Sequence, residues 1–170
     1  MKTTVQRTRL RQRPPRLLGL ALSLAIVAFG AVPAGAAGPP IAASGSYQQV
    51  SFAPSNFRTA GGVTFFDFTE HDNLSGTFSG TSVIQGSCMT RASGQTLCQA
   101  LETLTGTVAG QGGSGDTVTF RDVVRIDSTG GVRGSFTVVG GTGALTNLHG
   151  HGTFAGTSTG SYSGLLVLGP

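Results

Sequence analysis

The chain has 170 residues and a formal net charge of +4, a length that suits one domain with a single core. Six of its eleven Lys and Arg residues lie within residues 1–16, so residues 37–170 carry five arginines and seven acids, a formal charge of 5 − 7 = −2. So little basic surface cannot neutralise a phosphate backbone, and we therefore expect no nucleic-acid partner.

Residues 1–36 have the pattern of a secretory signal peptide. A basic segment without acids precedes an apolar run over 17–32, and small residues at 34–36 suit a signal peptidase. The alternative is a permanent membrane anchor, but the run is shorter than the ~20 residues that span a bilayer. We predict cleavage, an extracellular location and no stable anchor afterwards.

Residues 37–45 are rich in Gly, Pro and Ala, and we expect a flexible tail there, followed by one β domain over 46–170. The domain is dense in Thr, Ser, Val, Phe and Gly, with turn residues about every ten positions. This pattern predicts an all-β fold, as an eight-stranded antiparallel up-and-down barrel rather than a sandwich. The predicted strands are 46–53, 63–70, 74–86, 97–110, 116–127, 131–140, 149–157 and 161–168.

Cys88 and Cys98 flank a stretch with loop character. In an exported protein an even pair at this spacing indicates a disulfide that closes a hairpin end. The alternatives are two free thiols or a two-cysteine metal site. No other cysteine and no nearby histidine completes a ligand set, so we expect the disulfide and no metal.

The glycine-rich loop 140–143 follows a strand pattern over 131–140. A Gly-x-Gly-x-x-Gly loop binds a dinucleotide only when it opens a helix within a βαβ unit. Here Thr146 stands where the third glycine is needed, and the predicted strand 149–157 follows. The loop therefore indicates a structural turn, and we expect no cofactor.

Side-chain alternation places two carboxylates on inner faces. In 116–127, Asp122 shares a face with Phe120 and Val124, whereas Arg121 lies on the other face. In 97–110 the same counting turns Glu102 inward. Charges are seldom buried unless they are paired or solvated in a cavity. Each carboxylate could be satisfied by backbone amides or an arginine, or the two could act as catalytic groups.

Nine phenylalanines and no tryptophan lie beyond residue 37. They could fill the interior completely, or they could line a cavity for one small ligand. The predicted ligand-pocket residues are Phe78, Phe120, Phe136 and Phe154.

His149 and His151 stand two apart on one strand, opposite in orientation to Phe154. Two imidazoles at this spacing could contribute to a metal site with a third donor such as His71. Alternation places both on the outer face, so an exposed polar pair is the favoured interpretation.

Several motifs resemble an uncharacterised bacterial family within the allene oxide cyclase-like barrel superfamily, which also holds the plant dirigent proteins. The motifs are Leu101-Glu102-Thr103-Leu104-Thr105-Gly106, Gly134-Ser135-Phe136, Gly141-Thr142-Gly143-Ala144-Leu145 and Leu148-His149-Gly150-His151-Gly152-Thr153-Phe154. The resemblance covers most of 46–168, and the loop at 138–143 is similar to the dirigent loop. It implies an eight-stranded antiparallel barrel with an interior pocket and assigns no activity.

Two hypotheses for function follow. The first is a secreted barrel that binds a small apolar ligand or serves as an interaction module, with association into oligomers left open. The second is an isomerase, cyclase or dirigent-like enzyme that acts on an apolar substrate inside the barrel. In the enzyme, Glu102 and Asp122 would serve as acid or electrostatic stabiliser. The sequence does not decide whether the protein is an enzyme.

Overall fold

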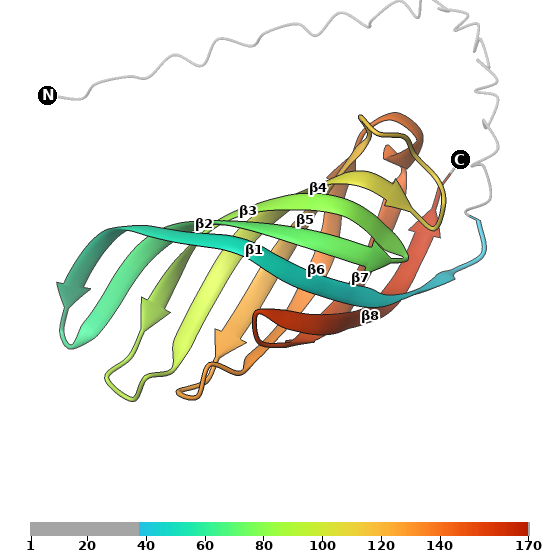
Figure 1. The fold of residues 1–170 in the computed structure, drawn as a ribbon. Coiled ribbons are helices and arrows are strands. Elements are labelled where there is room, and N and C mark those ends of the chain that lie inside the picture. Colours follow the sequence, from blue (N-terminus) through green and yellow to red (C-terminus); the bar gives the residue numbers. More distant parts are fainter. Residues whose placement is uncertain (1–37, 170) are drawn as a thin grey trace, which may run out of the picture. The chain divides into compact units, whose positions relative to one another are not determined.

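The computed structural model describes residues 38–169, and the predicted signal segment lies outside them. Eight strands and one short 3-10 helix form the domain (Figure 1). The elements are β1 Ile41–Ala60, β2 Val63–Gly76, β3 Phe78–Thr90, β4 Thr96–Val108, β5 Thr117–Ile126, β6 Val132–Gly141, η1 Gly143–Leu145, β7 Leu148–Gly156 and β8 Thr159–Leu168.

Each strand pairs antiparallel with the next, and β1 pairs with β8 to close one barrel. The prediction of eight antiparallel strands in one closed sheet is confirmed, and the sandwich alternative is wrong. The ring is uneven, because β8 pairs with β1 only from Ile41 to Gln48. Beyond this point the hairpin of β1 and β2 runs on away from β8 (Figure 1). Within residues 38–169, no helix has the length and apolarity needed to cross a membrane.

The first three predicted strands, 46–53, 63–70 and 74–86, have wrong boundaries, because the structure has β1 at Ile41–Ala60, β2 at Val63–Gly76 and β3 at Phe78–Thr90. Strand β1 begins at Ile41, which pairs with Leu166, so residues 41–45 belong to the sheet and not to a tail. Strand β2 continues through 71–73, where we expected a break. The polar residues there resemble a turn, but the turn comes at Gly76, whose φ of 100° suits glycine. The glycine-rich loop after β6 is a turn between strands, as predicted.

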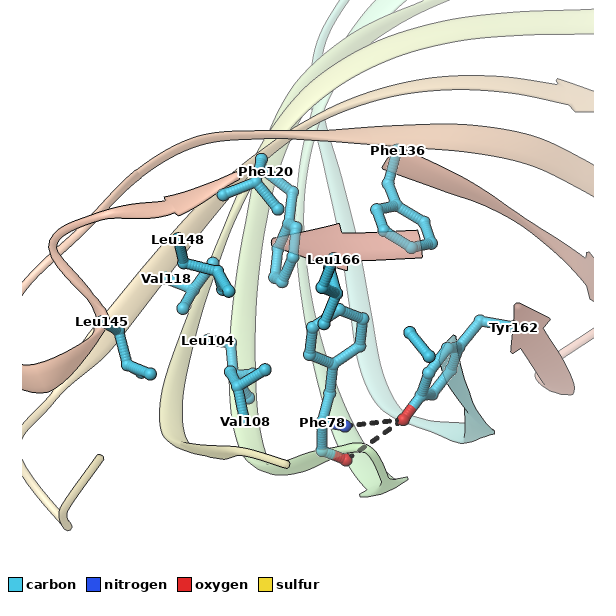
Figure 2. Close-up of a cluster of buried hydrophobic side chains, with 12 residues drawn as sticks. Phe78, Leu104, Val108, Val118, Phe120, Phe136, Leu145, Leu148, Tyr162 and Leu166 are labelled. Atoms are coloured by element: carbon cyan, nitrogen blue, oxygen red, sulfur yellow. Dashed lines mark hydrogen bonds between the residues drawn. The ribbon is translucent and has the colours of Figure 1, made fainter. Parts of the chain in front are cut away.

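The core fills one end of the barrel. Phe78, Phe120 and Phe136 meet edge to face, with ring centroids 5.1–5.7 Å apart. Leu145 of η1 is 1% exposed and belongs to the same buried cluster. Figure 2 shows these rings gathered with the aliphatic side chains of the cluster. The short helix thus brings an apolar side chain into the core that no strand supplies.

The Tyr162 side chain connects β8 to the turn between β2 and β3 through hydrogen bonds. Its hydroxyl accepts a hydrogen bond from the Phe78 amide (2.8 Å) and donates to the Ser75 carbonyl (2.9 Å). The contact with the Phe78 backbone is visible in Figure 2. Backbone groups left free by the corner are thereby satisfied by a side chain, and the aromatic ring stays in the core.

Gly80 and Gly106 face each other across β3 and β4. A Cβ on Gly106 would lie 2.1 Å from the Ser79 carbonyl oxygen, and one on Gly80 would lie 2.2 Å from that of Thr105. Their φ values of 153° and 155° also favour glycine. This side-chain-free crossing lets the sheet bend sharply around its core.

Cys88 and Cys98 lie opposite each other in β3 and β4 and form a disulfide (Sγ–Sγ 2.01 Å). The predicted disulfide is confirmed. Both cysteines are buried, and they pack with Phe68 and Ala100 in a second apolar cluster.

Replacing both cysteines by serine should lower the free energy of unfolding by about 2–3 kcal/mol, because the bond closes a short loop in the unfolded chain. Urea denaturation of the oxidised protein and the double variant measures this difference. Reduction of the unmutated protein should give a loss of similar size. Equal stability of the oxidised and reduced forms would contradict the prediction.

Candidate functional site

A cavity of about 330 Å³ occupies the other end of the barrel. All eight strands contribute to its walls. Rings of the core cluster, including those of Phe78, Phe120 and Phe136, form its deep end. Residues of the β5–β6 and β7–β8 turns, such as Gly130 and Ser158, also line it. The interior is therefore filled at one end and hollow at the other, which combines the two alternatives that the sequence left open.

The four predicted ligand-pocket phenylalanines all contribute to the cavity lining. Three of them are buried, and Phe154 of β7 is partly buried and meets the ring of Tyr47 edge to face at 6.2 Å. The cavity wall is thus largely aromatic and aliphatic, which suits an apolar molecule. That these residues bind a ligand stays a prediction.

Glu102 and Asp122 both line the cavity. Asp122 is 3% exposed, and its neighbours in β5, Arg121 and Val123, are exposed on the outer face. The register shift between β5 and β6 leaves the alternation of β5 intact, because the extra residue, Val139, lies in β6. The inward orientation expected from alternation is therefore what the structure shows, whereas the catalytic role of the two carboxylates stays a prediction.

Two further carboxylates, Glu70 and Asp72 of β2, line the same cavity. Sequence reasoning missed Asp72 because it placed a break at 71–73, and it did not assign Glu70, the last residue of the predicted strand 63–70, to the inner face. The signal was present in the alternation of Phe68, Glu70 and Asp72, which continues to Leu74 on one face. Glu70 accepts a hydrogen bond from Gln49 Nε2 of β1 (2.8 Å).

Burial and, after it, the charge of Glu102 together raise the pKa of Asp122 to about 8. Burial also raises the pKa of Glu102, to about 7. Two carboxyl groups that share a proton titrate as one unit. At neutral pH the pair therefore holds at least one proton.

The pKa of Asp72 in β2 is raised for the same reasons. Burial raises its pKa to about 8, with further contributions from the charges of Glu70 and Glu102. The same environment raises the pKa of the Tyr47 phenol, first through burial and then through Asp72 and Glu70. The four carboxyl groups thus interact across the cavity.

No positive charge balances this cavity. Among its lining residues, all within 38–169, none is Arg, Lys or His. Asp72 Oδ1, Asp122 Oδ1 and Ser82 Oγ are buried and accept or donate no hydrogen bond of good geometry. Buried polar atoms without partners cost free energy. The structure therefore leaves acceptor oxygens free at an apolar site.

His149 and His151 of β7 are exposed, as alternation predicts. Within the described part of the chain, no group of three or more His, Cys, Asp or Glu side chains is arranged to hold a metal ion. The carboxyl groups of the cavity can exchange protons with a bound molecule or attract a positive charge, and its walls can bury an apolar body.

A family model described as "Protein of unknown function (DUF3224)" matches residues 43–165. No curated protein matches the chain. A crystal structure of a protein of unknown function from the same family, from Shewanella oneidensis, is similar in fold, with a TM-score of 0.64 and 18% sequence identity. The match covers 78% of this chain and 100% of that one.

Proposed function

Because the chain belongs to the DUF3224 family, whose function is unknown, we propose its task from the cavity: the protein is a secreted barrel that binds one small, largely apolar molecule. The observation that carries this proposal is the hollow of about 330 Å³ beside a well-packed core. Its volume falls in the range of small-ligand sites, about 300–1,000 Å³. A barrel selected only for stability would gain by filling it, because voids cost packing energy.

Secretion is part of this proposal. The signal-like pattern of residues 1–36 supports export. The Cys88–Cys98 disulfide supports an oxidising location, because such bonds are rare in the cytosol. Kinship with the allene oxide cyclase-like superfamily is likewise proposed, from the motifs at 101–106 and 148–154 and the closed eight-stranded sheet.

Filling the cavity should weaken ligand binding. Val124 of β5 lines the cavity, so Val124→Trp places an indole in the ligand's volume. Neighbouring Val123 is 50% exposed on the outer face, and Val123→Trp is the matched control. We expect the neutral fluorophore N-phenyl-1-naphthylamine to bind the unmutated protein and the control, and to bind Val124→Trp at least ~10-fold more weakly. Equal binding by all three proteins would refute the cavity as the site.

A second candidate is an isomerase. The carboxyl pair of Glu102 and Asp122 favours it, since one member can donate a proton while the other accepts one. A proton removed from one carbon of an apolar substrate and returned to another would shift a double bond without a cofactor. A binding protein needs only the walls of the cavity, whereas this enzyme needs the pair.

A further inference from the structure

The cavity combines apolar walls with an unbalanced acidic band. We use the name acidic band for Glu70 and Asp72 of β2, Glu102 of β4 and Asp122 of β5. Glu70 has a hydrogen-bond partner in Gln49, and the charge of Glu102 raises the pKa of Asp122. Asp72 and Asp122 are 6% and 3% exposed, and each keeps one oxygen without a partner.

A ligand that fits these surroundings must bring positive charge. An anionic molecule would add repulsion to carboxyl groups that already repel one another. A purely apolar molecule would leave the free oxygens of Asp72 and Asp122 buried and unpaired. A bare metal ion would need several oxygen ligands arranged around it, and the described residues contain no such arrangement.

An ammonium group meets each requirement. It can donate hydrogen bonds to carboxyl oxygens of the acidic band, whose four residues line the cavity, and its charge offsets the band. The aromatic rings of the wall, such as Phe120 and Phe136, can cover the apolar body of the same molecule. Rings close to an ammonium add cation–π attraction.

We propose that the cavity takes up an apolar amine, with the ammonium group at the acidic band and the hydrophobic body against the aromatic wall. This inference rests on the proposed function, because it names the ligand class for the same cavity. It excludes fatty acids and other apolar anions as ligands of the site.

Uptake of such a ligand is coupled to proton release. The titratable groups that face the acidic band are Tyr47 of β1, Tyr162 of β8 and the four carboxyl groups themselves. A bound cation favours the ionised form of Asp72, Glu102 and Asp122, which hold protons at neutral pH because burial raises their pKa. Affinity for an amine should therefore rise from pH 5 to pH 8.

Three naphthalene probes of matched size test the charge requirement: 1-naphthylmethylamine, neutral 1-naphthylmethanol and anionic 1-naphthoate. Isothermal titration calorimetry of residues 37–170 at pH 8 should show the amine binding at least ~10-fold more tightly than the alcohol, and the carboxylate more weakly than either. The ratio of amine to alcohol affinity should shrink toward pH 5. Titration in buffers of different ionisation enthalpy should show protons released on amine binding.

Variants locate the effect in the acidic band. Asp122→Asn and Asp72→Asn should each reduce the preference for the amine over the alcohol while the alcohol still binds. Asp67→Asn is the matched control, because Asp67 lies outside the cavity lining and the substitution removes one carboxyl group, as the two test substitutions do. Unfolding curves confirm that each variant is folded before it is titrated.

The outcomes separate this inference from the proposed function. If the amine and the alcohol bind equally, or the carboxylate binds most tightly, the amine inference is overturned and ligand binding stands. If none of the three probes binds at millimolar concentration, both proposals are overturned. A preference for the amine that survives in both Asn variants but is lost in Asp67→Asn also overturns the amine inference.

Discussion

Raising the pH from 5 to 8 should destabilise the folded domain. Acidic groups that are ion-paired in the native state have the opposite effect, because they stabilise the fold as the pH rises. Asp72 and Asp122 have their pKa raised to about 8 and Glu102 to about 7. In the unfolded chain such groups titrate near pH 4. The folded state therefore holds protons that the unfolded state has released between about pH 4 and pH 8.

The sign follows from proton linkage. Where the folded state binds more protons, the free energy of unfolding falls as the pH rises. Each retained proton contributes a slope of about 1.4 kcal/mol per pH unit, so one proton retained between pH 5 and pH 7 amounts to about 3 kcal/mol. The contribution is complete below pH 4, is lost progressively as the pH rises, and is gone once the pH has passed through the folded-state values of 7–8. Asp127, whose pKa is lowered by Thr129 and Gly131, acts only at more acidic pH.

Urea denaturation from pH 5 to pH 8.5 measures this slope. Asp122→Asn removes one coupled carboxyl and should be more stable than the unmutated protein at pH 8 by on the order of 2 kcal/mol, with little difference at pH 5. Asp67→Asn should follow the unmutated profile. A flat profile for the unmutated protein, or one that rises with pH, would show that water or a bound cation compensates the acidic band.

The fold was largely predictable because period-two alternation and glycine turns recur along the whole domain. Strand β5 shows the alternation best, because Val118, Phe120 and Asp122 occupy its inner face at every second position. The predicted strand boundaries were wrong where polar residues continue in an extended conformation. Residues 71–73 look like a turn, and only the pairing of β2 with both β1 and β3 shows that they continue a strand.

The site was predictable in part for a related reason. Alternation alone predicted that Glu102 and Asp122 point inward. The missed continuation of β2 hid Asp72, and Glu70 at the end of the predicted strand was not assigned to the inner face. The hollow could not be foreseen from composition, because nine phenylalanines can fill a barrel or line it. The outcome depends on where the rings meet: Phe78, Phe120 and Phe136 contact one another at one end and leave the other end open.

Phe78→Ala should cost about 3–5 kcal/mol of unfolding free energy, the range for removing a buried aromatic ring. Phe78 is 2% exposed and contacts the rings of Phe120, Phe136 and Tyr162 at 5.0–5.7 Å. It also forms part of the cavity wall. Its removal therefore deletes three ring contacts and joins new empty volume to the cavity.

Phe57→Ala is the matched control. Phe57 is 63% exposed and stacks only on Phe66 among the rings of the described domain, at 5.5 Å, so its loss should cost less than about 1.5 kcal/mol. Urea denaturation at pH 5 compares the two variants while the carboxyl groups are protonated. A small molecule such as benzene should restore part of the stability of Phe78→Ala, because an apolar void binds apolar ligands. Equal losses of unfolding free energy in the two variants would mean that Phe78 stabilises the core no more than an exposed ring does.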